Sequence, residues 1–124
     1  MKKFFKGFIY AFNGVKLSFQ ERNMKVHTVA AIVVLIVACF FPLSSADWVE
    51  LLFAIGLVLS AETFNTAIEQ LVNLIRDDCH VPYANKKLGK AKDLSAGAVL
   101  IAATAAAVIG LRIFLPHIIE AVTK

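Results

Sequence analysis

Two carboxylates lie inside a long apolar stretch of the chain and are the first candidates for chemistry. Glu62 and Glu69 belong to an apolar run over residues 48–75, and their seven-residue spacing is nearly two helical turns, so they share a helix face. Insertion scales put an acid at the centre of a membrane helix at about +2.5 to +3.5 kcal/mol, and such acids are usually functional. The polar face that carries Glu62 and Glu69 therefore indicates either a row of polar contacts between packed helices or a reactive site. Three further polar residues fall near the same face: Asn65, Thr66 and Asn73.

Further charged groups are expected at the same level, on the segments that flank the apolar runs: Glu21, Lys92 and Asp93. Carboxylates, a divalent cation and a lysine are the parts that phosphoryl transfer needs, and Mg²⁺ commonly takes one or two carboxylates plus phosphate oxygens. No nucleotide-binding glycine motif supports this chemistry, because Gly89-Lys90 lacks an upstream glycine and a following Ser or Thr. The absence of this motif thus excludes a soluble-kinase fold, and phosphoryl transfer remains one option for the charged groups.

The elements that position these groups are predicted from composition and periodicity. Of the 124 residues, 59% are hydrophobic and 18% are charged, which is typical of an integral membrane protein. Phe4, Phe8 and Phe12 recur at helical spacing opposite lysines, as in a helix lying in the membrane interface. We therefore expect an all-α membrane protein with a single domain, residues 1–124. Its predicted elements are a surface helix over 2–20 and transmembrane helices over 26–43, 48–75 and 95–116.

Capping and breaking residues suggest where the helices begin and end. Asp47 and Asp93 are expected as N-caps of the second and third spans, and Pro116 is expected to end the third. A polar hinge over residues 21–27 and a loop over 76–92 complete the predicted layout. Both polar segments adjoin the candidate charged groups.

The basic residues indicate the orientation in the membrane. Six of the 13 lie in the first 25 positions and five lie between the second and third apolar runs, which leaves only Arg112 and Lys124 elsewhere. By the positive-inside tendency, both basic regions face the cytoplasm, with the N-terminus inside and Arg112 reaching towards the outer interface. The positive balance thus points to lipid head groups and topology, and no motif points to nucleic acid as a partner.

Two segments together resemble a known family signature. The stretch Glu62-x-x-Asn65-Thr66-Ala67-Ile68-Glu69, followed by Ala91-Lys92-Asp93-x-x-Ala96-Gly97-Ala98-Val99, resembles that of the bacterial diacylglycerol kinase/undecaprenol kinase family. The surface helix and three spans match as well, so the resemblance covers nearly the whole chain. It implies a homotrimeric lipid kinase of the bacterial cytoplasmic membrane that uses Mg²⁺ and ATP, with active sites shared between protomers on the cytoplasmic face.

The resemblance also implies roles for individual residues. Glu62 matches the catalytic base, and Asn65 lies beside it at the lipid substrate. Glu21 and Glu69 match the acids that hold Mg²⁺ on ATP. The residues that match nucleotide-contacting positions are Glu21, Glu69, Asp78, Cys79, His80, Lys92 and Asp93. The chain differs from the family pattern in a longer segment between His80 and Lys92 and in Asn73, where the family often has Asp.

The lipid that is phosphorylated is the remaining question. Glu21-Arg22-Asn23-x-x-x-His27 resembles the undecaprenol kinase branch, which favours conversion of undecaprenol to undecaprenyl phosphate. The alternative is a diacylglycerol kinase that makes phosphatidic acid. A buried glutamate in a tiny helical membrane protein also fits a small multidrug or proton-coupled transporter, which would need no acid or lysine at the interface.

Overall fold

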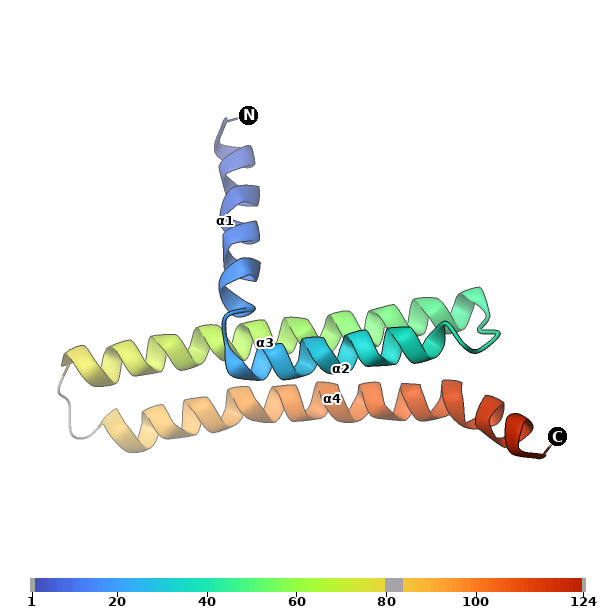
Figure 1. Cartoon of the computed structure of the whole chain (residues 1–124). Helices are drawn as coiled ribbons and strands as arrows, with labels where there is room; N and C mark the ends of the chain where they lie inside the picture. Colours follow the sequence, from blue (N-terminus) through green and yellow to red (C-terminus); the bar gives the residue numbers. More distant parts are fainter. Residues whose placement is uncertain (1, 80–83, 124) are drawn as a thin grey trace.

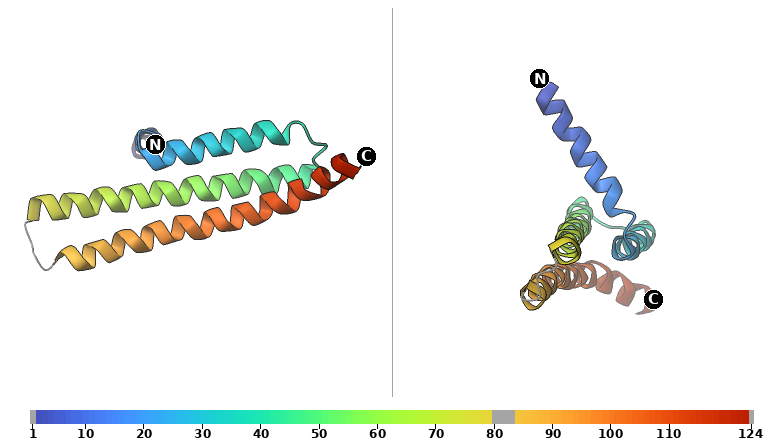
Figure 2. Two further views of the ribbon diagram at one scale, coloured as in Figure 1. Left: turned by 60° about the horizontal axis from the view of Figure 1, so that its bottom comes forward. Right: turned by 90° about the vertical axis from the view of Figure 1, so that its left-hand side faces the viewer.

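The computed structural model describes residues 2–79 and 84–123, and this part of the chain is helical throughout apart from two short connections. The helices are α1 (Lys2–Ser18), α2 (Arg22–Ala38), α3 (Ser45–Cys79) and α4 (Ala84–Thr123). Figure 1 shows α2, α3 and α4 running side by side, with α1 projecting across their direction. Seen end-on, α2, α3 and α4 form a triangle (Figure 2). Among the helix pairs, α3 packs most extensively on α4. The predicted all-α architecture is confirmed.

The outer surface of this bundle is apolar, as expected for contact with lipid. Large side chains such as Val33, Phe53 and Leu100 are more than half exposed, and the buried core is small. Within the described ranges, two helical stretches are long and apolar enough to cross a membrane, Ser45–Asp77 and Lys86–Thr123. With 17 residues, α2 is about 26 Å long, slightly less than a hydrocarbon core of about 30 Å. The chain thus has the fold of a helical membrane protein.

Two connections differ from the prediction. The α2 helix ends at Ala38, whereas the first span was expected to reach residue 43, and the apolar residues that follow form a turn before α3. The predicted hinge over residues 21–27 is almost entirely helical, because α2 already begins at Arg22. Only Phe19, Gln20 and Glu21 separate α1 from α2, and the extended backbone of Glu21 turns the chain through the corner.

The expected N-caps and helix stop are wrong. Ser44 caps α3, since Asp47 N donates to Ser44 Oγ (3.2 Å) and Ser44 N donates to Asp47 Oδ2 (3.1 Å), which is a reciprocal capping box. Asp93 lies inside α4, because the expected loop over 76–92 is helical up to Cys79 and again from Ala84. Pro116 also lies inside α4. The last turns of α4 bend away from the rest of the helix (Figure 1), and a proline is a common cause of such a bend.

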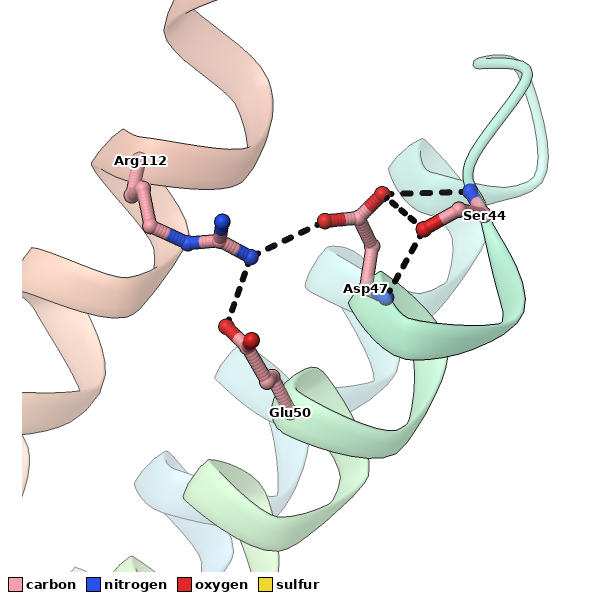
Figure 3. Close-up of polar contacts among 4 residues, drawn as sticks. All are labelled: Ser44, Asp47, Glu50 and Arg112. Atoms are coloured by element: carbon pink, nitrogen blue, oxygen red, sulfur yellow. Dashed lines mark hydrogen bonds and ion pairs between the residues drawn. The ribbon is translucent and has the colours of Figure 1, made fainter.

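An ion-pair cluster joins the two longest helices near the start of α3 (Figure 3). Arg112 Nη2 on α4 lies 3.0 Å from Asp47 Oδ1 and 2.6 Å from Glu50 Oε2 on α3. The same Asp47 carboxylate accepts the hydrogen bonds of the capping box, so one acid serves both the cap and the cross-link. Because the partners are 62 and 65 residues apart in sequence, the cluster fixes how far α4 is displaced along α3.

Reversing the charge at this cluster should weaken the α3–α4 pairing. We expect Arg112→Glu to lower the midpoint of thermal unfolding in detergent by a few degrees, the scale of partly exposed ion pairs. The double variant Arg112→Glu/Glu50→Arg should recover part of the loss. Arg76→Glu is the matched control, since among the described residues Arg76 pairs with its chain neighbour Asp77 and does not link two helices. An equal loss in the control would show that the cluster does not tie the helices together.

Candidate functional site

A buried polar cluster lies where α2 and α4 both meet the middle of α3. Glu62 is 2% exposed and Asn65 is 3% exposed, although the helix around them is apolar. Thr66 completes the buried polar face of α3, one turn from Glu62. A buried charge is tolerated only where polar groups surround it, so the partners of Glu62 define the site.

The carboxylate of Glu62 meets polar side chains of two helices. The Asn65 side chain, one turn further along α3, and the Asn23 side chain of α2 lie within hydrogen-bonding reach of this carboxylate. His27, one turn after Asn23, and Glu69 are near enough for their charges to act on it. The early start of α2 therefore has a consequence for the site, because it places Asn23 and His27 on a helix directly beside α3.

The α4 helix closes the site from the other side. Ser95, which is buried, has its Oγ 2.8 Å from Asn65 Oδ1 and 2.9 Å from the backbone oxygen of Lys92. One turn earlier, Lys92 Nζ donates to Asn73 Oδ1 over 3.4 Å. Ser95 and Lys92 therefore share the face of α4 that packs on α3, and they bring a hydroxyl and a cation to the polar stripe.

Of the two acids expected to hold Mg²⁺, Glu21 contacts α3 at the residue next to Glu69. Glu21 Oε1, at the corner between α1 and α2, accepts a hydrogen bond of 3.1 Å from Gln70 Nε2 of α3. Gln70 directly follows Glu69, which is half-buried and near enough to Glu62 for the two charges to interact. Carboxylate oxygens beside open space suit a Mg²⁺ ion that takes its other ligands from phosphate and water. Among the described residues no three acidic, His or Cys side chains form a metal cage, so a metal would need such outside ligands.

An apolar cavity of about 540 Å³ begins beside this polar cluster. His27 lines one end, and the walls are formed by apolar side chains of α2, α3 and α4, among them Ala31, Val58 and Ala107. The other end is lined by Leu115 and Ile118 of α4. The cavity, which is partly open to the surroundings, therefore runs from the level of His27 along the three helices and can hold a hydrocarbon chain.

Not every residue singled out from the sequence joins the cluster. Asp93 is exposed and borders a separate shallow groove with Gly97 and Ile101. It lies two residues before Ser95, about 200° around α4, and so faces away from Glu62 of its own chain. The side chains of Asp78 and Cys79, together with the whole of His80, lie outside the described residues.

Sequence reasoning missed several partners. Ser95 received no role, and Asn23 and Gln70 were not considered as contacts of the acids. Each depends on how neighbouring helices are rotated and displaced against α3, which the pattern of one segment does not specify. The small residues that follow Ser95 were the available signal, because they indicated that this face of α4 packs closely on another helix.

Comparison with known proteins gives consistent matches over most of the chain. The family model for prokaryotic diacylglycerol kinase matches residues 9–114. An undecaprenol kinase of Bacillus subtilis is 41% identical over 119 residues, which cover 95% of this chain and 93% of the relative. A diacylglycerol kinase of Synechocystis is 36% identical over 91% of this chain and 63% of its own length. A diacylglycerol kinase of Escherichia coli is 30% identical over 75% of this chain and 73% of the relative.

Proposed function

The chain belongs to the prokaryotic diacylglycerol kinase family and is a lipid kinase, and we propose that it transfers the γ-phosphate of ATP to the hydroxyl of undecaprenol. The observation that carries the proposal is the buried Glu62, held by polar groups of α2 and α3 at the end of an apolar cavity. Membership of a kinase family also decides against the small transporter that a buried glutamate alone allows.

In the proposed reaction, Glu62 is the general base and touches the acceptor hydroxyl. The hydroxyl oxygen of the lipid attacks the γ-phosphorus of ATP, the bond to the β-phosphate oxygen breaks, and ADP leaves. The hydroxyl proton passes to the Glu62 carboxylate and from there to water. Asn65, which lies within hydrogen-bonding reach of the base, orients the carboxylate and the acceptor. Burial excludes bulk water from the carboxylate, so the lipid hydroxyl meets little competition as the nucleophile.

The nucleotide side of the site lies further along α3. Glu21 and Glu69 would hold Mg²⁺, which when bound would neutralise charge on the phosphates. The ammonium group of Lys92, which donates a hydrogen bond to Asn73, would bind the same phosphates through its positive charge. Asn73 is an amide where the family pattern often has an acid, so here it accepts from Lys92 without neutralising it. Asp78, Cys79 and His80 remain proposed nucleotide contacts on the basis of the family resemblance.

The lipid side is the apolar cavity that begins at His27. A hydrocarbon chain that follows this cavity would bring its terminal hydroxyl to Glu62, because His27 belongs both to the cavity wall and to the surroundings of the carboxylate. Undecaprenol is favoured by the Bacillus subtilis relative, whose match covers nearly all of both chains. Diacylglycerol is the alternative acceptor, since the relatives from Synechocystis and Escherichia coli are diacylglycerol kinases.

We further propose a trimer in the bacterial cytoplasmic membrane, with three spans per chain, the N-terminus inside and the site on the cytoplasmic face. The exposed phenylalanines of α1, which projects across the bundle, suit a helix lying in the membrane surface (Figure 1). The ends of α3 and α4 that extend past the start of α2 would then reach the cytoplasm (Figure 2). Asp93 faces away from its own Glu62, so it is available to a neighbouring protomer.

The acceptor and the base can be tested in one assay. Purified protein in detergent should consume ATP only when a lipid alcohol is added. Undecaprenol should be preferred over diacylglycerol, and a polyprenol too short to fill the cavity should have a higher KM.

Glu62→Gln keeps the side-chain shape and removes the proton acceptor, so turnover should fall about 100-fold or more while ATP affinity changes little. Near-normal turnover in this variant would make Glu62 a packing residue.

The metal assignment predicts a change in Mg²⁺ dependence. Glu21→Gln and Glu69→Gln each remove a charge that faces the metal, so each should raise the Mg²⁺ concentration at half-maximal activity several-fold. Glu50→Gln is the matched control, because Glu50 lies at the opposite end of α3 beside Arg112. Identical Mg²⁺ titrations for wild type and both site variants would refute the assignment.

Sites shared between protomers predict complementation. Glu62→Gln and Asp93→Asn protomers should each be inactive alone. After subunit exchange between them, some sites would combine an intact Glu62 with an intact Asp93 of the neighbour, and activity should return. If each site draws both residues from one chain, every site in the mixture carries a lesion and the mixture stays inactive. A mixture of Glu62→Gln and Glu62→Ala protomers, which both lack the carboxylate and cannot complement, is the control.

A further inference from the structure

Ser95 is a buried hydroxyl that belongs neither to the metal acids nor to the base, yet it contacts the site directly. Its Oγ is 2.8 Å from Asn65 Oδ1 and 2.9 Å from the backbone oxygen of Lys92. Ser95 is 7% exposed and Asn65 is 3% exposed, so water competes little for this contact. Thirty residues separate the two in sequence, and their hydrogen bond is a buried side-chain link between α3 and α4.

A hydroxyl carries one proton, so the two nearby oxygens compete for it. The Lys92 carbonyl lies inside α4 and already accepts the backbone N–H four residues further on. The Asn65 amide oxygen is a side-chain acceptor in a buried position, where an unmet acceptor is costly. The Ser95 proton is therefore better used by Asn65 than by the Lys92 carbonyl, and we assign it to Asn65.

This contact fixes which way the Asn65 amide faces. An asparagine presents an oxygen on one side and an NH₂ group on the other, and the two orientations have nearly the same shape. With Oδ1 occupied by Ser95, the NH₂ group turns to the opposite side of the amide. Glu62 lies one turn back on the same helix, so the NH₂ group can donate to its carboxylate.

We propose that Ser95 is a positioning residue, whose hydroxyl holds the Asn65 amide oxygen so that the Asn65 NH₂ group faces the Glu62 carboxylate. The inference rests on the proposed function, in which Glu62 is the base. Without the hydroxyl, the amide can turn its oxygen towards the carboxylate, and two acceptors then face each other. The base is consequently misoriented for the acceptor hydroxyl in a larger fraction of molecules.

Removal of this hydroxyl should affect turnover more than binding. Ser95→Ala should lower kcat about 3- to 10-fold, the range of one hydrogen bond, with KM for ATP unchanged. Ser95→Thr retains a hydroxyl at the same position and should restore kcat. The matched control is Thr104→Val on the same helix, since in the described part of the chain the Thr104 hydroxyl donates within α4, to the Leu100 carbonyl over 2.8 Å.

A double-mutant cycle separates positioning from a general effect on packing. In an Asn65→Ala background the amide is absent, so Ser95→Ala should cause no further fall in kcat. The inference about Ser95 is overturned if kcat is unchanged in Ser95→Ala, or if Ser95→Ala causes the same fractional loss of kcat with and without Asn65. Lipid-dependent ATP turnover by the wild type would still uphold the proposed function in that case. A wild-type protein that shows no lipid-dependent ATP turnover overturns both.

Discussion

The structure depends on the burial of one carboxylate in an apolar helix. A charge at the position of Glu62 is tolerated only if neighbouring helices supply polar groups, and they do so from both sides. Asn23 and His27 come from α2, and Ser95 from α4 reaches Glu62 through Asn65. The buried carboxylate needs polar neighbours, and each helix that supplies one also places a chemically useful group beside Glu62. The burial of the acid and the formation of the site therefore have the same cause.

Away from this level the bundle has little to hold it together in water. Few apolar side chains are buried, and α2 to α4 expose large ones to their surroundings. In a membrane, lipid covers these surfaces, and helices associate through close packing and polar contacts, with little help from the hydrophobic effect. The apolar cavity and the outward-facing Asp93 fit the proposed lipid substrate and the proposed trimer, in which a neighbouring protomer would complete the site.

The sequence predicted the helices and the acid stripe, because periodicity and the cost of an intramembrane acid are local properties. Where helices begin and end was predicted less well. Ser44 and Asp47 could each act as the N-cap, and only their reciprocal hydrogen bonds decide for Ser44. The contacts of Ser95 could not be predicted, because they depend on the rotation of α4 against α3. The family resemblance supplied roles for Glu21 and Glu69 that spacing alone could not give.

Two polar links at different levels of α3 and α4 explain how so small a fold positions its site. Arg112 binds Asp47 and Glu50 at one end, while Ser95 and Lys92 bind Asn65 and Asn73 nearer the other. Between them the facing residues of α4 are mainly small, such as Ala103 and Ala106, and they line the cavity. Two fixed points determine both the displacement and the rotation of one helix against another, so the hydroxyl of Ser95 arrives at Asn65 without a large packed core. The ion pairs of Arg112 with Asp47 and Glu50 thus contribute to the geometry of a site that they do not contact.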